Sequence, residues 1–259
     1  MWSACLNRSI SISEQMDLGK AERFISETQM ESKAGIEAAL QLKEKCPGST
    51  VTVVSMGPPQ ADVALREALA MGCDDALLIS DRAFGGADTW ATSSTIAAAL
   101  KKLDYDVIIT GRQAIDGDTA QVGPQIAEHL GIPQVSYVEK MDVEGEDTLV
   151  VQRQFEDRHQ IIEVKTPCLL TALAELADPR YMSVHGVFDA YREKEVKVWG
   201  LEDIKDTVNE GNIGLKGSPT RVKKSFTKQA KGAGTILNDL SDDEAVAAIV
   251  EKLQEKHII

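Results

Sequence analysis

The sequence lacks the features that mark membrane, secreted or nucleic-acid-binding proteins. Its apolar runs are too short to span a bilayer, and residues 1–28 contain no apolar core of the kind found in secretory signals. Basic residues number 28 against 41 acidic ones, which gives a net charge of −13. This balance argues against binding to a nucleic-acid backbone or to an anionic membrane. We therefore expect a cytoplasmic protein that binds neither.

Residues that form catalytic or metal sites are few and dispersed. The four cysteines form no Cys-x-x-Cys pair and have no histidine near them in sequence, so we expect neither a zinc site nor a disulfide framework. The four histidines share no motif, and the sequence Gly-x-Ser-x-Gly is absent. We assign no catalytic and no metal-binding residue. The expectation is a ligand-binding protein rather than an enzyme in its own right.

Helix and strand patterns alternate from Lys33 to Ala174. Helical spacing of apolar residues predicts helices over Lys33–Lys45, Gln60–Met71, Asp88–Leu103 and Ala120–Leu130. Continuous apolar runs predict strands over Thr50–Met56, Ala76–Ser80 and Tyr105–Thr110. Because these strands are apolar on both faces, the order predicts an α/β fold with a mostly parallel, doubly wound nucleotide-binding sheet.

After Ile132 the pattern changes. Alternating segments joined by polar turns predict antiparallel strands appended to the sheet, at Gln134–Met141, Thr148–Phe155 and Gln160–Val164, followed by a buried strand at Pro167–Ala172. Residues 178–240 are polar and show little periodicity, typical of either a disordered tail or an arm that docks on a partner. We favour the arm because aromatic residues persist in it. Asp242–His257 predicts an amphipathic helix with a capping box formed by Ser241 and Glu244.

The segment Gly111–Gly123, GRQAIDGDTAQVG, is the main candidate for a binding site. It joins a predicted strand to a predicted helix, which is where open α/β sheets bind ligands. The free N–H groups at the start of a helix suit a phosphate. Spacing alone leaves an ordinary capped turn as the alternative, because the segment matches neither Gly-x-Gly-x-x-Gly nor a P-loop. Met56-Gly57-Pro58-Pro59 ends a neighbouring strand, so the two turns predict a crevice.

Several blocks of the sequence resemble the beta subunit of electron transfer flavoproteins. They are MGPPQ from Met56, LREALAMGC from Leu65, DRAFGGADTWATS from Asp81 and GRQAIDGDTAQVGPQIAEHLG from Gly111, the longest and most specific. The resemblance runs from Lys33 to the C-terminus. It implies a heterodimer with an alpha subunit that carries flavin adenine dinucleotide (FAD). In that family the beta subunit supplies an α/β nucleotide-binding domain and a C-terminal arm that wraps the partner.

The Gly111–Gly131 block is similar to that of the electron-bifurcating members of anaerobic metabolism, which hold a second FAD in the beta subunit. The resemblance implies that NADH delivers two electrons there. One passes to a ferredoxin or flavodoxin, and the other passes through the alpha flavin to an acyl-CoA or 2-hydroxy acid dehydrogenase. A conventional member with structural AMP is the alternative, and a stand-alone adenine-nucleotide-binding module is a more distant one.

The resemblance also assigns residues by position. The implied cofactor-binding residues are Met56, Arg112, Gln113, Ala114, Ile115, Asp116, Gly117, Asp118, Thr119, Ala120, Gln121, Val122 and Gly123, with phosphates near Thr119–Gly123. Tyr181–Ala190 aligns with the loop by which the family recognises its dehydrogenase, so the implied partner-recognition residues are Tyr181, Val184 and Phe188. The stretch from Phe188 to Glu193 is far less basic than in the family, which leaves the dehydrogenase open.

The first 32 residues depart from the resemblance. The family begins with an apolar strand and a Lys-Gln-Val-Pro-Asp-Thr turn at the nucleotide, and neither occurs here, so we expect no strand before residue 33. A slipped reading frame or misassigned start is one explanation, and genuine divergence is the other. If the segment is real, we expect a missing central strand and weakened cofactor binding. The expected organisation is an atypical segment 1–32, a nucleotide-binding domain 33–177, and a partner-wrapping arm with its terminal helix, 178–259.

Overall fold

The computed structural model describes residues 8–13, 21–114, 117–221, 223, 232, 234, 236, 238 and 240–259, with the main chain alone for 8–13 and 21–29. Contacts divide the chain into two units, Met1–Arg221 and Val222–Ile259. The expected boundary at residue 177 therefore falls inside the first unit. Near the end of that unit, Thr220 is hydrogen-bonded to the residue that precedes helix α3, Thr89–Leu100: its N–H and hydroxyl donate to the Asp88 carboxylate at 2.9 and 2.7 Å.

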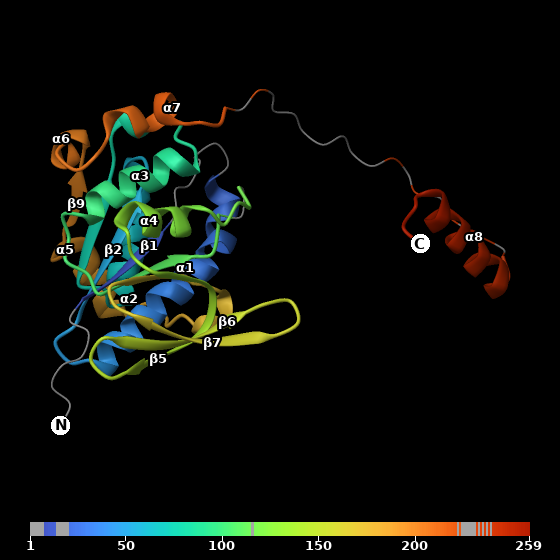
Figure 1. Ribbon diagram of the computed structural model, residues 1–259, viewed down its shortest axis with the longest axis horizontal. Helices are drawn as coiled ribbons and strands as arrows, with labels where there is room; N and C mark the ends of the chain where they lie inside the picture. The colour runs from blue at the N-terminus through green and yellow to red at the C-terminus, as the bar shows by residue number, and fades with distance from the viewer. Residues whose placement is uncertain are drawn as a thin grey trace. The chain divides into compact units, whose positions relative to one another are not determined.

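A single mixed sheet forms the centre of the first unit (Figure 1). Its strands are β1 Arg8–Ser13, β2 Thr50–Met56, β3 Asp75–Ile79, β4 Val107–Gly111, β5 Gln134–Glu144, β6 Thr148–Gln154, β7 His159–Lys165, β8 Cys168–Ala172 and β9 Val196–Trp199. They lie in the order β7-β6-β5-β8-β4-β1-β2-β3-β9. Among the described strands, only the β5–β6 and β6–β7 pairs are antiparallel, so the predicted parallel sheet with appended antiparallel strands is confirmed.

The expectation of no strand before residue 33 is wrong. β1 lies at the middle of the sheet and pairs in parallel with both β2 and β4. Its sequence, RSISIS, alternates serine with isoleucine and lacks the apolar run that marks a buried parallel strand. Ladder pairing uses main-chain groups, however, and the facing edges of β2 and β4 would otherwise leave buried N–H and C=O groups unpaired. The central strand whose loss was expected is thus present.

Helices cover both faces of the sheet. The helices of the described residues are α1 Ala21–Lys45, α2 Asp62–Met71, α3 Thr89–Leu100, α4 Val122–Leu130, α5 Val184–Arg192, α6 Leu201–Ile204, α7 Gly214–Gly217 and α8 Asp242–Glu255. α1, α2 and α5 pack on one face, around a core that includes Leu65, Val53 and Ala190. α3, α4 and α6 pack on the other, around Ile96, Ile126 and Ile108. This is the doubly wound arrangement that the sequence predicts.

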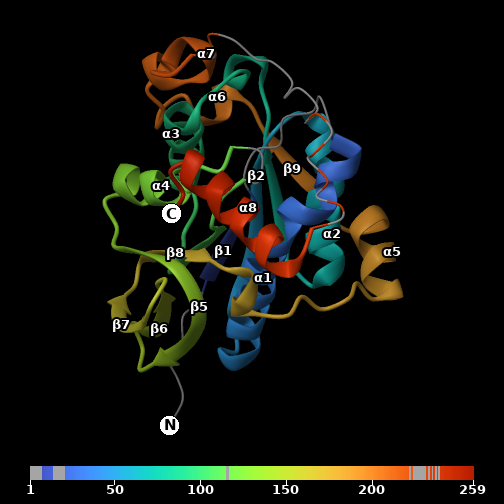
Figure 2. The ribbon, with the colours of Figure 1, turned by 90° about the vertical axis from the view of Figure 1, so that its right-hand side faces the viewer.

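α5 lies beside α2 (Figure 2). The contact is close because α5 carries Gly186, where a Cβ would overlap the carbonyl oxygen of Ala70. Arg66 of α2 also donates a hydrogen bond to the carbonyl of Ala190. Neither α5 nor β9 was predicted within residues 178–221. β9 has only four residues, and the apolar residues of α5 have helical spacing but are exposed instead of packed in the core.

In the second unit, α8 begins at the predicted capping box. The Ser241 N–H and hydroxyl both donate to the Glu244 carboxylate, at 2.9 and 2.7 Å. The helix buries none of its residues, and its apolar stripe, which includes Val246 and Ile249, is exposed. Across the described parts of both units, we find no helix with the length and apolar character needed to cross a bilayer.

Candidate functional site

The strand order changes direction between β1 and β4, and we call the position outside the carboxyl ends of these two strands the β1–β4 crevice. From β1 the chain proceeds outward through β2 to β3, and then it returns to the other side of β1 to form β4. Connections from these two neighbouring strands therefore leave in opposite directions. Such a switch point is where open α/β sheets bind ligands. The segment Gly111–Gly123 begins at the last residue of β4 and lies at this position.

The loop between β4 and α4 is held by hydrogen bonds between its own residues, and its backbone is strained. Gln113 donates a hydrogen bond to the carboxylate of Asp118, and the Asp118 N–H donates to the carbonyl of Ala114 at 2.9 Å. Asp118 and Ala120 have φ angles of 48° and 51°. Left-handed conformations at two non-glycine residues in one loop store strain of the kind that concentrates at functional sites. Ile115 and Asp116 lie outside the described residues.

The first turn of α4 is built to approach another group closely. A Cβ at Gly123 would lie 2.6 Å from Thr110 Oγ1 and 2.9 Å from Thr171 Cγ2, so only glycine fits against the strand ends. Gln121, the N-cap residue, makes no side-chain cap hydrogen bond, and its side chain instead accepts from Thr89 Oγ1 at 2.9 Å. Val122 and Gly123 are the first residues of the helix, so their N–H groups have no intrahelical acceptor. They suit an anion at the helix N-terminus.

Arg112 and Glu31 form an ion pair beside this loop, with Arg112 Nη2 3.0 Å from Glu31 Oε1. Glu31 also accepts from the main-chain N–H of Gln113 at 3.4 Å. Burial raises the pKa of the Glu31 carboxyl, and the attraction of Arg112 only partly opposes this. Glu31 was absent from the predicted site residues, because its contact with the loop depends on how α1 crosses the sheet. No sequence signal near residue 31 reveals it.

Two buried polar atoms flank the loop without a hydrogen-bond partner among the described residues. They are Thr110 Oγ1, on β4, and Arg112 Nε. Buried polar groups are nearly always satisfied, so atoms like these indicate a missing partner. A nucleotide phosphate or hydroxyl at the crevice would supply one. The residues present therefore fit a nucleotide, because the guanidinium of Arg112 and the N-terminus of α4 both suit a phosphate.

The remaining predicted cofactor-binding residues take up distinct positions. Met56 ends β2, and its side chain is only 1% exposed and belongs to the core, so its contact with a ligand would use the main chain. Gly117, Asp118, Thr119 and Gln121 are exposed in the loop, while Gln113, Ala114 and Ala120 are half-buried there. Val122 and Gly123 are buried in α4. No group of three or more His, Cys, Asp or Glu side chains within the described residues is arranged to hold a metal ion.

The predicted partner-recognition residues gather on and just before α5. Tyr181 is 98% exposed, Val184 77% and Phe188 52%. Tyr191 is also exposed, and it follows Val184 by two helical turns. Arg66 lies over the Tyr191 ring and Arg192 over the Phe188 ring, with guanidinium carbons 5.2 and 5.0 Å from the ring centroids. The result is an apolar, aromatic face with two cations at its edges.

Comparison with known proteins identifies the family. The Electron transfer flavoprotein domain matches residues 26–204. The electron transfer flavoprotein subunit beta of Clostridium acetobutylicum is 60% identical over 229 residues, which is 88% of this chain and 86% of that protein. The chain belongs to the electron transfer flavoprotein family. Its resemblance to the beta subunits of electron transfer flavoproteins is thereby confirmed.

Other electron transfer flavoprotein relatives carry names that refer to reductases. The caffeyl-CoA reductase-Etf complex subunit CarD of Acetobacterium woodii is 53% identical over 225 residues, which is 86% of this chain and 84% of that protein. The acryloyl-CoA reductase electron transfer subunit gamma of Anaerotignum propionicum is 50% identical over 232 residues, which is 87% of this chain and 85% of that protein. As a member of this flavoprotein family, the chain is an electron-transfer subunit that works in association with flavin and with partner subunits.

Proposed function

We propose that the chain is the beta subunit of a heterodimeric, electron-bifurcating electron transfer flavoprotein. In this proposal it binds FAD in the β1–β4 crevice and takes part in passing electrons from NADH. One acceptor is a ferredoxin or flavodoxin, and the other is an acyl-CoA or 2-hydroxy acid dehydrogenase. The observation that carries the nucleotide site of this proposal is the strained loop at the switch point. Among the described residues, Arg112 Nε has no partner there and the N-terminus of α4 has no side-chain cap.

The chain's own residues bind and orient the cofactor in this account. Arg112 and the N–H groups of Val122 and Gly123 hold the phosphates, because a guanidinium and a helix N-terminus both favour negative charge. The Gln113–Asp118 hydrogen bond keeps the loop in the conformation that exposes these groups. FAD, when bound, supplies the capacity to accept a hydride and to release electrons singly.

The relatives named as electron transfer subunits of CoA-thioester reductases support an acyl-CoA dehydrogenase as one acceptor. The apolar face formed by Tyr181, Val184, Phe188 and Tyr191 is proposed as the surface on which that dehydrogenase docks. Large exposed aromatic side chains on one helix face mark protein interaction sites. The low basicity of this face leaves the 2-hydroxy acid class as the alternative.

The second unit is proposed to bind the alpha subunit. α8 buries none of its residues within this chain, although it carries the apolar stripe of a helix that packs on another surface. A partner subunit would cover that stripe. A conventional beta subunit with AMP in the crevice would use the same surface, so α8 does not distinguish the two readings.

Coupled electron transfer tests the proposed bifurcation. The purified heterodimer would be mixed with NADH and ferredoxin, with and without the dehydrogenase and its oxidised substrate. Bifurcation predicts that ferredoxin is reduced only when the dehydrogenase and its substrate are present together, because the uphill electron depends on the downhill one. Transfer to the dehydrogenase with no ferredoxin reduction under any condition would identify a conventional carrier instead.

A further inference from the structure

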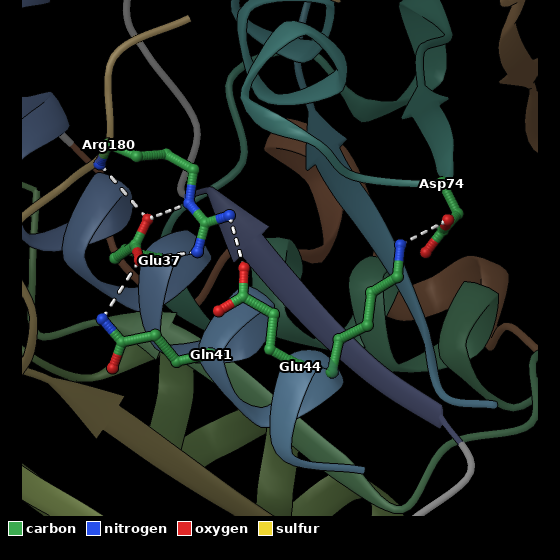
Figure 3. Close-up of polar contacts among 6 residues, drawn as sticks. Glu37, Gln41, Glu44, Asp74 and Arg180 are labelled. Atoms are coloured by element: carbon green, nitrogen blue, oxygen red, sulfur yellow. Dashed lines mark hydrogen bonds and ion pairs between the residues drawn. The ribbon is translucent and has the colours of Figure 1, made fainter. Parts of the chain in front are cut away.

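Arg180 fastens the segment between β8 and α5 to helix α1. Its main-chain N–H and its Nε both donate to Glu37 Oε2, at 3.2 and 2.7 Å, and its Nη2 donates to Glu37 Oε1 at 2.9 Å. The remaining nitrogen, Nη1, donates to Glu44 Oε1 at 2.7 Å. Figure 3 shows the guanidinium held between the two carboxylates, which lie two helical turns apart on α1.

Both carboxylate oxygens of Glu37 accept hydrogen bonds from Arg180. The Glu37 side chain is almost fully buried, and its Oε1 also accepts from Gln41 Nε2 at 3.0 Å. Burial raises the pKa of the Glu37 carboxyl, but the hydrogen bonds from Arg180 and Gln41 outweigh it and leave the pKa lowered. A buried carboxylate that lost the guanidinium would be left charged and unpaired. The Arg180–Glu37–Glu44 cluster, hereafter the clamp, is therefore a strong and specific tie.

The residue next to Arg180 has the opposite character. Tyr181 is almost wholly exposed, and it makes no hydrogen bond or ring contact within the described part of the chain. Among the described residues, the clamp provides the only hydrogen bonds that join residues 178–182 to the rest of the protein. Arg180 thus makes four hydrogen bonds to α1, and they hold a segment whose exposed side chain, Tyr181, contributes nothing to the core.

α5 is anchored independently of the clamp. Gly186 permits its close contact with α2, Ser183 caps its N-terminus by accepting from the Gly186 N–H at 2.9 Å, and Arg66 donates to the carbonyl of Ala190. Loss of the clamp would therefore leave α5 in place and release only the segment before it. That segment carries Tyr181, at the edge of the proposed docking face.

We propose that Arg180 is a positioning residue that preorganises Tyr181 for docking of the dehydrogenase. This inference rests on the proposed docking function of the Tyr181 and α5 face. A segment that is already ordered loses less conformational entropy on binding than a free one, so preorganisation strengthens docking without adding a contact. Arg180 itself acts through Tyr181 rather than on the electrons.

The test uses the complete heterodimer and whichever acyl-CoA or 2-hydroxy acid dehydrogenase accepts its electrons. The variants are Arg180→Ala, Arg180→Lys, Tyr181→Ala and the double variant, with Arg158→Ala as a control on the exposed end of the β6–β7 hairpin. For each, the KM for the dehydrogenase, kcat and flavin content are measured. We expect Arg180→Ala to raise the KM about 10-fold with kcat and flavin content unchanged, and Arg180→Lys to restore part of the loss.

The double variant separates positioning from a merely structural role. If Arg180 acts through Tyr181, the double variant raises the KM no further than Tyr181→Ala alone, since the anchor to be positioned is already gone. Multiplicative effects, or an Arg180→Ala variant with an unchanged KM, would overturn the inference while leaving the docking face intact. If Tyr181→Ala itself has no effect on the KM, Tyr181 is not an anchor for docking and the inference is wrong.

Discussion

Glu31 on α1 and Arg112 after β4 are paired at 3.0 Å across the edge of the crevice. Six residues further along the same helix, Glu37 holds Arg180 of the proposed docking segment. One helix therefore supports both the candidate nucleotide site and the candidate docking face, through two carboxylate–guanidinium pairs. The first pair leaves Arg112 Nε without a partner among the described residues, which is the donor that the account assigns to a phosphate.

Replacement of this guanidinium tests its role in nucleotide binding. We expect Arg112→Ala to weaken FAD binding about 10- to 100-fold, because a charge-assisted hydrogen bond contributes about 1.5–3 kcal/mol. Arg112→Lys keeps the charge but loses the planar fork, so it should recover only part of the affinity. Fluorescence titration of the heterodimer with FAD measures the effect. The control Arg158→Ala removes an exposed arginine far along the sheet and should bind FAD as the unaltered protein does.

The fit of α4 against the strand ends makes Gly123 sensitive to a single methyl group. Gly123→Ala would crowd Thr110 Oγ1 and Thr171 Cγ2, and we expect a loss of about 1–3 kcal/mol of unfolding free energy. Gly117→Ala is the matched control, since a Cβ there meets nothing within 4 Å. Urea unfolding measures both. Equal stability of the two variants would show that α4 does not pack as described.

The clamp makes stability depend on pH. The folded-state pKa of Glu37 lies below its ordinary value of 4.5, so the unfolded state takes up this proton first as the pH falls. The clamp therefore stabilises the protein fully above about pH 4.5, and its contribution is lost as the pH falls through the lower folded-state pKa. Glu37→Gln should show a shallower fall in unfolding free energy between about pH 5 and pH 3. Parallel curves for the two proteins would contradict this assignment.

The apolar stripe of α8 gives a test of subunit association. Ile249→Asp places a charge on that stripe, and we expect it to weaken binding of the alpha subunit at least about 10-fold, because a buried unpaired charge is strongly unfavourable. Ala248→Asp introduces the same charge on the side of the helix away from the stripe. Sedimentation or light scattering of the mixed subunits should find the heterodimer intact in this control. Loss of association in both variants, or in neither, would argue against the stripe as the contact surface.

Much of the fold follows from local sequence. β2 begins and ends where its β-branched run predicts, and α8 begins at its capping box. β1 could not be predicted, because its alternating serines carry no signal of burial and its place depends on the two strands that flank it. Glu31 and Glu37 were missed for a related reason, since each acquires its role from a residue far along the chain. The loop after β4 was found because a strand end, a helix start and glycines coincide there.

The cofactor content of the complex tests the central claim most directly. The chain would be coexpressed with its alpha subunit, the purified complex denatured, and the released FAD and AMP counted per heterodimer. The account predicts two FAD and no AMP, one of the two held in the β1–β4 crevice. One FAD together with one AMP, or one FAD with no nucleotide in this chain, would contradict it.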